Sequence, residues 1–232
     1  MTWPCYPGRM TLVVLPQGST SGGGGTGGAG TFTTPPTAGW TWRNQGTTTR
    51  QDAADGSAIS LIKPANGANA ANVTLYTRAI PASRRVTMAF RFLVAGGLNT
   101  SQFPFAGLTL FDTGTGKFIS YHLSFNGLGT TGPGIELAKF DNFTTFNSTY
   151  LPALQGCFLD IIWLRCTQPA AAGNRVVEWS PDGEVWLPLA LQTVAYNDFI
   201  TPNAIGLSVD GYGLTGNQTF GSIIKLLSWN ET

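Results

Sequence analysis

Twelve carboxylates and one histidine are the side chains of this 232-residue chain that could carry acid–base chemistry. Cleavage of a glycosidic bond takes two carboxylic groups held a few ångströms apart, and a Glu-x-Asp-x-(x-)Glu cluster on one strand can supply them. The acidic residues here are scattered instead, and Glu136 and Glu178 would meet only if the fold brought them together. The sequence therefore predicts a protein that is not an enzyme.

His122 alternates with Ser120 and Ser124, which indicates a polar sheet face. A Ser-His-acid relay is formally available, but no Gly-x-Ser-x-Gly elbow accompanies it. One interpretation makes His122 an exposed or half-buried residue of an ordinary strand. The other makes this face a shallow sugar site, with Arg91 and Asn126 beside the histidine.

Metal and cofactor signals are weak. One histidine and three dispersed cysteines do not form a typical zinc site. The loop carboxylates Asp112 and Asp210 leave calcium open, because carboxylates and carbonyls are its usual ligands. The glycine tract 22–30 lacks the Lys-Ser/Thr ending of a phosphate-binding loop. We expect no cofactor.

The composition limits the partners. Charged residues make up 11% of the chain and the net charge is +1, so no basic surface for nucleic acid is expected. No apolar run reaches the roughly 18 residues needed to span a bilayer, and no signal sequence is evident. The lack of both predicts a chain made in a cytoplasm. The low charge is typical of a protein packed among neighbours.

A period of two dominates the pattern after residue 39. Val86, Met88, Phe90 and Phe92 alternate with polar or small residues, and the segment 119–125 alternates in the same way. Strands are predicted at 58–63, 73–80, 86–92, 105–111, 119–125, 135–140, 158–166, 176–180, 185–190, 204–209 and 223–229. Turn residues separate nearly all of them, which predicts an all-β, two-sheet antiparallel sandwich or jelly roll.

One hairpin is nearly explicit in the segment 178–186. Pro181 and Asp182 suit a type I turn, and Gly183 suits the left-handed position that follows it. Trp179 and Trp186 are expected to pack together, either covering the end of the sandwich or stacking on a sugar ring. Tyr212 is a further aromatic candidate for glycan binding.

Residues 1–38 read as an extended arm rich in Gly and Pro, and residues 39–232 as the β domain. Glycine has the most backbone freedom to lose, so the arm is expected to become ordered only on another protein. Its expected assembly contacts are Trp3, Cys5, Tyr6, Leu12, Val13 and Val14. Cys5 is either a free thiol or one half of an inter-subunit disulfide.

Several segments together resemble a family. They are Trp40-Thr41-Trp42-Arg43-Asn44-Gln45-Gly46, Ala106-Gly107-Leu108-Thr109-Leu110-Phe111-Asp112 with Gly116-Lys117, Trp179-Ser180-Pro181-Asp182-Gly183 with Trp186, Asp198-Phe199-Ile200-Thr201-Pro202, and Ile205-Gly206-Leu207. The chain is similar over residues 39–232 to the concanavalin A-like, laminin-G-like jelly rolls of tailed-bacteriophage virion proteins. That resemblance implies two curved antiparallel sheets and, in many members, glycan binding. Fold alone does not fix function.

Two functions therefore stand as expectations. The first is a non-enzymatic structural virion protein, a capsid decoration or tail component assembled in the host bacterial cytoplasm. Its partners would be capsid or tail subunits and further copies of itself, for instance in a trimer. The alternative is a lectin-like module that binds host or environmental glycans, with Arg91, His122, Asn126, Trp186 and Tyr212 as candidate contacts.

Overall fold

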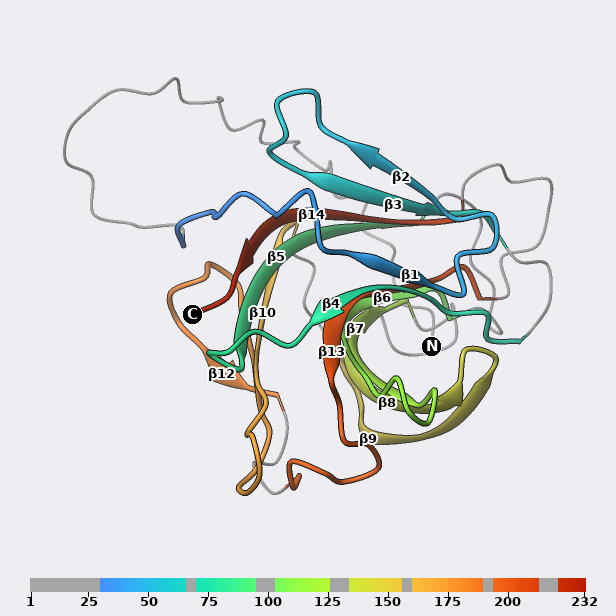
Figure 1. The fold of residues 1–232 in the computed structure, drawn as a ribbon. Coiled ribbons are helices and arrows are strands. Elements are labelled where there is room, and N and C mark those ends of the chain that lie inside the picture. The colour runs from blue at the N-terminus through green and yellow to red at the C-terminus, as the bar shows by residue number, and fades with distance from the viewer. Residues whose placement is uncertain are drawn as a thin grey trace, which may run out of the picture.

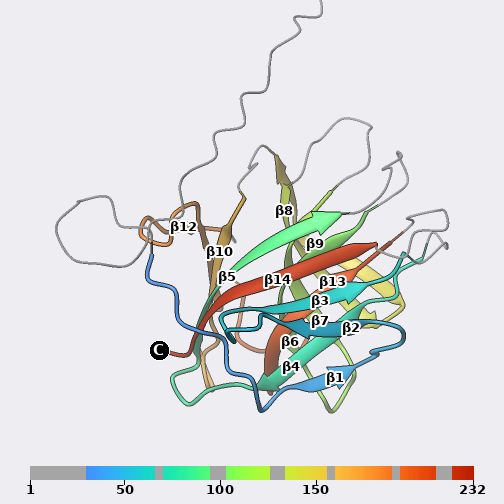
Figure 2. The same ribbon diagram turned by 90° about the horizontal axis from the view of Figure 1, so that it is seen from above.

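The computed structural model describes residues 30–65, 70–94, 103–125, 134–155, 160–189, 194–212 and 221–232. These residues form fourteen strands in two antiparallel sheets of seven, which confirms the predicted sandwich. Figure 1 shows the two layers, and Figure 2 shows them from above. The described part contains no helix, and so none that is long and apolar enough to cross a membrane.

The first sheet has the order β1-β4-β13-β6-β7-β8-β9. Its strands are β1 (Thr41–Arg43), β4 (Thr74–Ala79), β13 (Ala204–Asp210), β6 (Phe105–Phe111), β7 (Phe118–Ser124), β8 (Gly134–Asn142) and β9 (Thr145–Gln155). In Figure 1 the strands β6 to β9 curl round, so the face turned away from the second sheet is concave. This concave face holds the candidate site.

The second sheet has the order β12-β11-β10-β5-β14-β3-β2. Its strands are β12 (Leu187–Pro188), β11 (Val176–Ser180), β10 (Ile162–Thr167), β5 (Arg85–Val94), β14 (Ser222–Asn230), β3 (Ile59–Lys63) and β2 (Thr49–Asp52). The predicted bounds of β6 and β11 are confirmed to the residue. The predicted strand 158–166 begins later, at Ile162, among the described residues, and 185–190 shortens to Leu187–Pro188.

The main core lies between the sheets, because each strand turns alternate apolar residues inward. Its fully buried members include Leu61, Met88, Phe90, Leu108, Leu110, Ile119, Leu164, Leu207, Ile224 and Leu226. A second apolar cluster covers the concave face of the first sheet, where Phe105, Phe111, Phe118 and Phe140 are buried. That face is therefore built of aromatic rings rather than left to solvent.

The predicted hairpin at 178–186 forms, but its two tryptophans do not pack on each other. Gly183 has φ +82°, the left-handed conformation expected of it. Trp179 lies opposite Leu187, so it and Trp186 point to opposite faces. Trp179 packs on the main core, and Trp186 lies over the guanidinium of Arg165, 4.0 Å from its ring centroid.

Part of the predicted arm lies on the body of its own chain. Gly30 N–H donates to the carbonyl of Asp182, and Thr33 exchanges two hydrogen bonds with β14 through Ser228 and Trp229. The C-terminal end lies beside these first described residues in Figure 1. Residues 30–38 thus belong to the surface of the sandwich, ahead of the predicted boundary at 39. The expected assembly contacts between Trp3 and Val14 lie outside the described residues.

Candidate functional site

A pocket of about 320 Å³ opens on the concave face of the first sheet. Its described lining combines five aromatic rings with three polar side chains. They are Phe103, Phe105, Phe140, Phe146 and Tyr212, with His122, Ser124 and Glu136, and the small residues Ala71 and Ala138 complete the wall. A small concave site, mostly apolar with a few placed polar groups, is the usual form of a ligand pocket.

The polar end of the pocket is set by strand register. His122 lies opposite Gly107 on one side and opposite Glu136 on the other, so all three share the concave face. A Cβ atom on Gly107 would lie 2.5 Å from the Cα of His122, so only glycine allows this close approach. Gly107 therefore fixes how His122 is placed in its strand pair.

A chain of hydroxyls holds the His122 ring from behind. His122 Nδ1 lies 2.9 Å from Ser120 Oγ, which lies 2.7 Å from Ser208 Oγ. On the other side of the ring, Nε2 lies 3.7 Å from Glu136 Oε2, beyond hydrogen-bond length. If Ser208 donates to Ser120, and Ser120 donates to Nδ1, the proton of the neutral ring is on Nε2, facing the carboxylate.

Aromatic rings form the floor and the rim. The ring of Phe105 stacks on the imidazole of His122, with centroids 4.1 Å apart. Phe140 stacks on Phe118 below it, and Phe146 meets Phe140 edge-on. Phe146 is 51% exposed at the rim, so an apolar ring face is offered to solvent beside the polar end.

The structure brings together two of the five residues proposed for glycan binding. His122 and Tyr212 line the same pocket. Arg91 is on the second sheet, in an ion pair with Asp160, and Trp186 covers Arg165 on that sheet. Asn126 lies outside the described residues. Sequence reasoning missed Glu136 and the phenylalanines as lining residues. The signal for Glu136 was its place in the strand that follows His122 in the sequence, where strict alternation puts it on the same face as His122 if the two pair.

The expectation that His122 is exposed or half-buried is wrong. The side chain is 2% exposed, and its neighbours Ser120 and Ser124 are equally buried. The curl of the first sheet turns its polar alternation inward, so both parities of β7 are covered. Ser120 has no exposed surface, so its hydroxyl is placed to orient the imidazole rather than to reach a ligand.

A buried carboxylate, Asp210, lies close in the chain to one wall of the pocket. Asp210 Oδ2 accepts a hydrogen bond from the backbone N–H of Asn72, 3.0 Å away, and Lys63 is the cation whose charge acts on this carboxylate. Lys63 Nζ donates to Thr74 Oγ1. Asn72 follows the lining residue Ala71, and Asp210 precedes Tyr212 by two positions. Burial raises the pKa of Asp210 to about 7.

The two carboxylates considered for calcium have other roles in the described structure. Burial alone would raise the pKa of Asp112, but hydrogen bonds from Gly114, Thr115 and Thr201 together lower it. That pattern is a carboxylate closing a turn. No group of three or more His, Cys, Asp or Glu side chains that could hold a metal ion occurs among the described residues.

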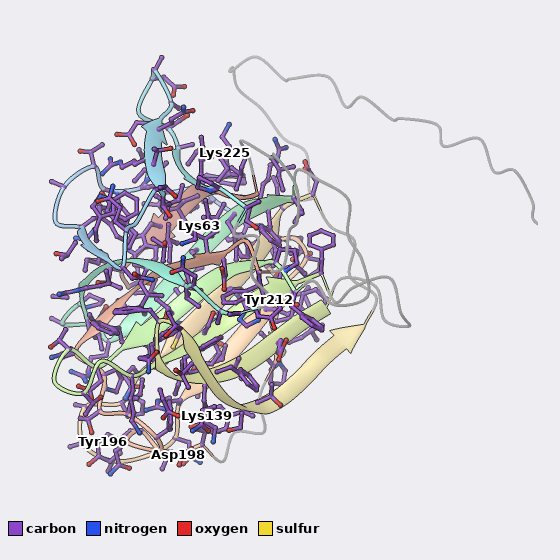
Figure 3. All side chains as sticks on the ribbon, turned by 90° about the vertical axis from the view of Figure 1, so that its right-hand side faces the viewer. Lys63, Lys139, Tyr196, Asp198, Tyr212 and Lys225 are labelled. Atoms are coloured by element: carbon purple, nitrogen blue, oxygen red, sulfur yellow. The ribbon has the colours of Figure 1, made fainter. Side chains whose placement is uncertain are left out.

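Figure 3 shows Lys139 apart from Tyr212. Lys139 lies instead over the ring of Tyr150, 4.0 Å from its centroid, and Tyr150 donates to Asp198. Cys166 is a buried free thiol in the main core, where burial raises its pKa to about 12. These groups are therefore separate from the pocket.

Comparisons with known proteins identify a fold. No protein-family model and no curated protein matches the sequence. An engineered GH43 glycoside hydrolase with endo-xylanase and exo-arabinofuranosidase activity matches at 16% identity and a TM-score of 0.52, covering 92% of this chain and 42% of that one. A bifunctional GH43-CE protein of Bacteroides eggerthii matches at 15% identity and 0.50, covering 85% and 24%.

A Lotus tetragonolobus seed lectin also matches, at 9% identity and a TM-score of 0.48, covering 85% of this chain and 94% of the lectin. This chain spans less than half the length of the two hydrolase chains. At such identities the two hydrolase likenesses concern the fold alone. They support the β-sandwich, and the chemistry of the site has to be argued from its own residues.

Proposed function

We propose that this chain is a carbohydrate-binding module and that its site is the pocket on the concave face of the first sheet. The observation that carries the proposal is the placement of His122 and Glu136, 3.7 Å apart, within a wall of aromatic rings. In the tautomer that carries its proton on Nε2, one sugar hydroxyl between them can accept from His122 Nε2–H and donate to Glu136 Oε2. The ring faces then pack on the C–H faces of the same sugar.

The lining favours binding over hydrolysis. Glu136 is the one carboxylate among the described lining residues. Glu178, its possible partner in a two-carboxylate mechanism, is on the second sheet and lies 2.6 Å from the Arg165 guanidinium. A glycosidase of that type needs both groups on one substrate, roughly 5–9.5 Å apart. We therefore propose a module that holds a glycan without cleaving it.

A binding experiment tests this proposal. The full chain is screened on a glycan array, and the best ligand is measured by calorimetry against His122→Ala. Loss of a buried hydrogen-bond partner is expected to weaken binding about tenfold or more. Phe146→Ala, which truncates an exposed rim ring, is expected to weaken binding too, without the risk of misfolding that a buried site carries.

Trp186→Ala is the matched control, because it removes an aromatic ring from the second sheet. Its affinity is expected to equal that of the unmodified chain. The proposal fails if no saccharide on the array binds. It also fails if Trp186→Ala abolishes binding while folded His122→Ala and Phe146→Ala retain it.

The role in a virion stays a prediction from the sequence. It assigns capsid or tail subunits as partners of the arm, whose first 29 residues lie outside the described part. Display on a particle and glycan binding are compatible in one chain, since the pocket and residues 30–38 lie on different sheets of the sandwich.

A further inference from the structure

On the basis of the proposed function, we infer that the pocket takes a neutral saccharide and discriminates against uronic, sialic or sulfated sugars. The inference rests on which charges surround His122. Among the described lining residues, Glu136 is the one carboxylate, and none is lysine or arginine. An anionic sugar would meet a carboxylate there without the cation that normally recognises an anion.

The segments after residue 29 that lie outside the described residues cannot supply that cation, because they carry no charged side chain. Residues 66–69, 95–102, 126–133, 156–159, 190–193 and 213–220 contain no Lys, Arg, His, Asp or Glu in the sequence. Two of these segments directly precede or follow a lining residue in the sequence, before Phe103 and after Tyr212, and a third lies between β7 and β8. Every charge of residues 30–232 is therefore on a described residue. Arg9 is the one charged residue before residue 30.

No described cation lines the pocket, and most of them are engaged elsewhere. Arg43 is on the concave side, but its guanidinium lies over Phe111, at the opposite end of β6 from the lining residue Phe105. Lys63 is buried and bonded to Thr74. The remaining engaged pairs include Lys117 with Asp141, Arg91 with Asp160, Arg165 with Glu178 and Arg78 with Glu231.

The size of the pocket agrees with a short ligand. At about 320 Å³ it is at the small end of the roughly 300–1,000 Å³ typical of ligand pockets. Glu136 is 21% exposed in its side chain, so it faces an incoming ligand while its surroundings limit screening by water and salt. A neutral hydroxyl satisfies this carboxylate by donating to it, whereas a second carboxylate cannot.

The test uses pairs of sugars that differ only at C6. Calorimetry on the full chain compares oligomers of glucose with glucuronate, galactose with galacturonate, and mannose with mannuronate. The neutral member of the best pair is expected to bind at least tenfold more tightly. Its affinity is expected to stay constant between 50 and 500 mM NaCl, because no ion pair is formed.

Glu136→Gln is expected to reduce the ratio of neutral-sugar to acidic-sugar affinity several-fold. Glu184→Gln, on the exposed hairpin, is the control and is expected to leave that ratio unchanged. If Glu136→Gln fails to fold, the ratio of neutral to acidic affinities is followed across the salt series. Because the Glu136 side chain is partly exposed, salt screens its charge in part, so the ratio should narrow modestly at 500 mM NaCl. Tighter binding of an acidic sugar that His122→Ala abolishes would overturn the inference and keep the proposed function. Binding of neither member of any pair would overturn the inference, and binding of no saccharide on the array would refute the proposed function as well.

Discussion

Asp210 is the residue whose environment departs most from that of an ordinary carboxylate. It is completely buried, and its Oδ1 has no hydrogen-bond partner among the described residues. Burial raises its pKa to about 7, against the backbone N–H of Asn72 and the charge of Lys63, which both lower it. Burial in turn lowers the pKa of Lys63, and the charge of Asp210 offsets part of that change.

A pH dependence of stability follows from this raised pKa. Between about pH 4 and pH 7 the folded carboxyl holds a proton that the unfolded chain, with an aspartate pKa of about 3.9, has released. The free energy of unfolding should therefore fall as pH rises through this window, by at most about 1.4 kcal/mol per pH unit from this group. Asp210→Asn should lack this part of the slope in urea denaturation series from pH 4.5 to 8.

Asp160→Asn is the control for that series, because the Asp160 side chain is 73% exposed and its loss should leave the slope intact. Parallel curves for Asp210→Asn and the unmodified chain would contradict the assignment.

The candidate site could be predicted from the sequence only in part. The alternation around His122 predicts that it shares one face of its strand with Ser120 and Ser124, and the sequence also offers Tyr212 as an aromatic candidate. The burial of His122 depends on the curl of the first sheet, which a strand's own alternation does not encode. Arg91 and Trp186 share the residue types of a glycan site, but the chain order of strands does not show that both belong to the other sheet.

At the scale of elements, the close packing of strands in the first sheet depends on two glycines on adjacent strands. A Cβ on Gly107 would lie 2.1 Å from the carbonyl oxygen of Tyr121, and one on Gly206 would lie 2.2 Å from that of Tyr76. No real Cβ contact is that short, so β6 and β13 approach their neighbours as only glycine permits. Glycine within a strand often marks such a close approach.

Gly107→Ala should therefore destabilise the chain, although replacing a strand glycine by alanine ordinarily stabilises it. The new methyl group would push against the backbone of β7, and overpacking of this kind costs about 1–3 kcal/mol. Urea denaturation gives the loss, and saccharide titration should show weakened binding because His122 shifts with β7. Thr145→Ala, at the exposed start of β9, serves as the control. Unchanged stability of Gly107→Ala would refute this account of the close approach.

The alternation of apolar residues predicted most of the strands, and the missed ones show its limits. β1 and β2 are short and polar edge or near-edge strands, with little apolar alternation to detect. β9 carries Pro152 and mostly polar residues, and it is an edge strand with register shifts against β8, where a proline is tolerated. Edge strands bury less side-chain area, so their sequences are less constrained.

At the scale of the whole molecule, residues 30–38 close the outer side of the sandwich. Phe32 packs on Trp163 with ring centroids 5.0 Å apart, although it stays 46% exposed. The indole of Trp40 donates to the carbonyl of Pro36, 2.6 Å away. Gly30 and Gly183 approach so closely that a Cβ on either would lie 2.9 Å from the other's Cα. The hairpin turn therefore fixes the position of Gly30 on the sandwich.

Two truncations separate this segment from the part of the arm that precedes it. A chain beginning at residue 39 loses the Phe32 contact and both hydrogen bonds of Thr33, so its free energy of unfolding should fall by about 2 kcal/mol or more. A chain beginning at residue 30 keeps all of them and should differ from the full chain by less than about 0.5 kcal/mol. Equal stability of the two truncated chains in urea would place the start of the folded body at residue 39, as the sequence predicted. A large loss on removing residues 1–29 alone would mean that the glycine tract contributes to folding, against the entropy argument that makes it an arm.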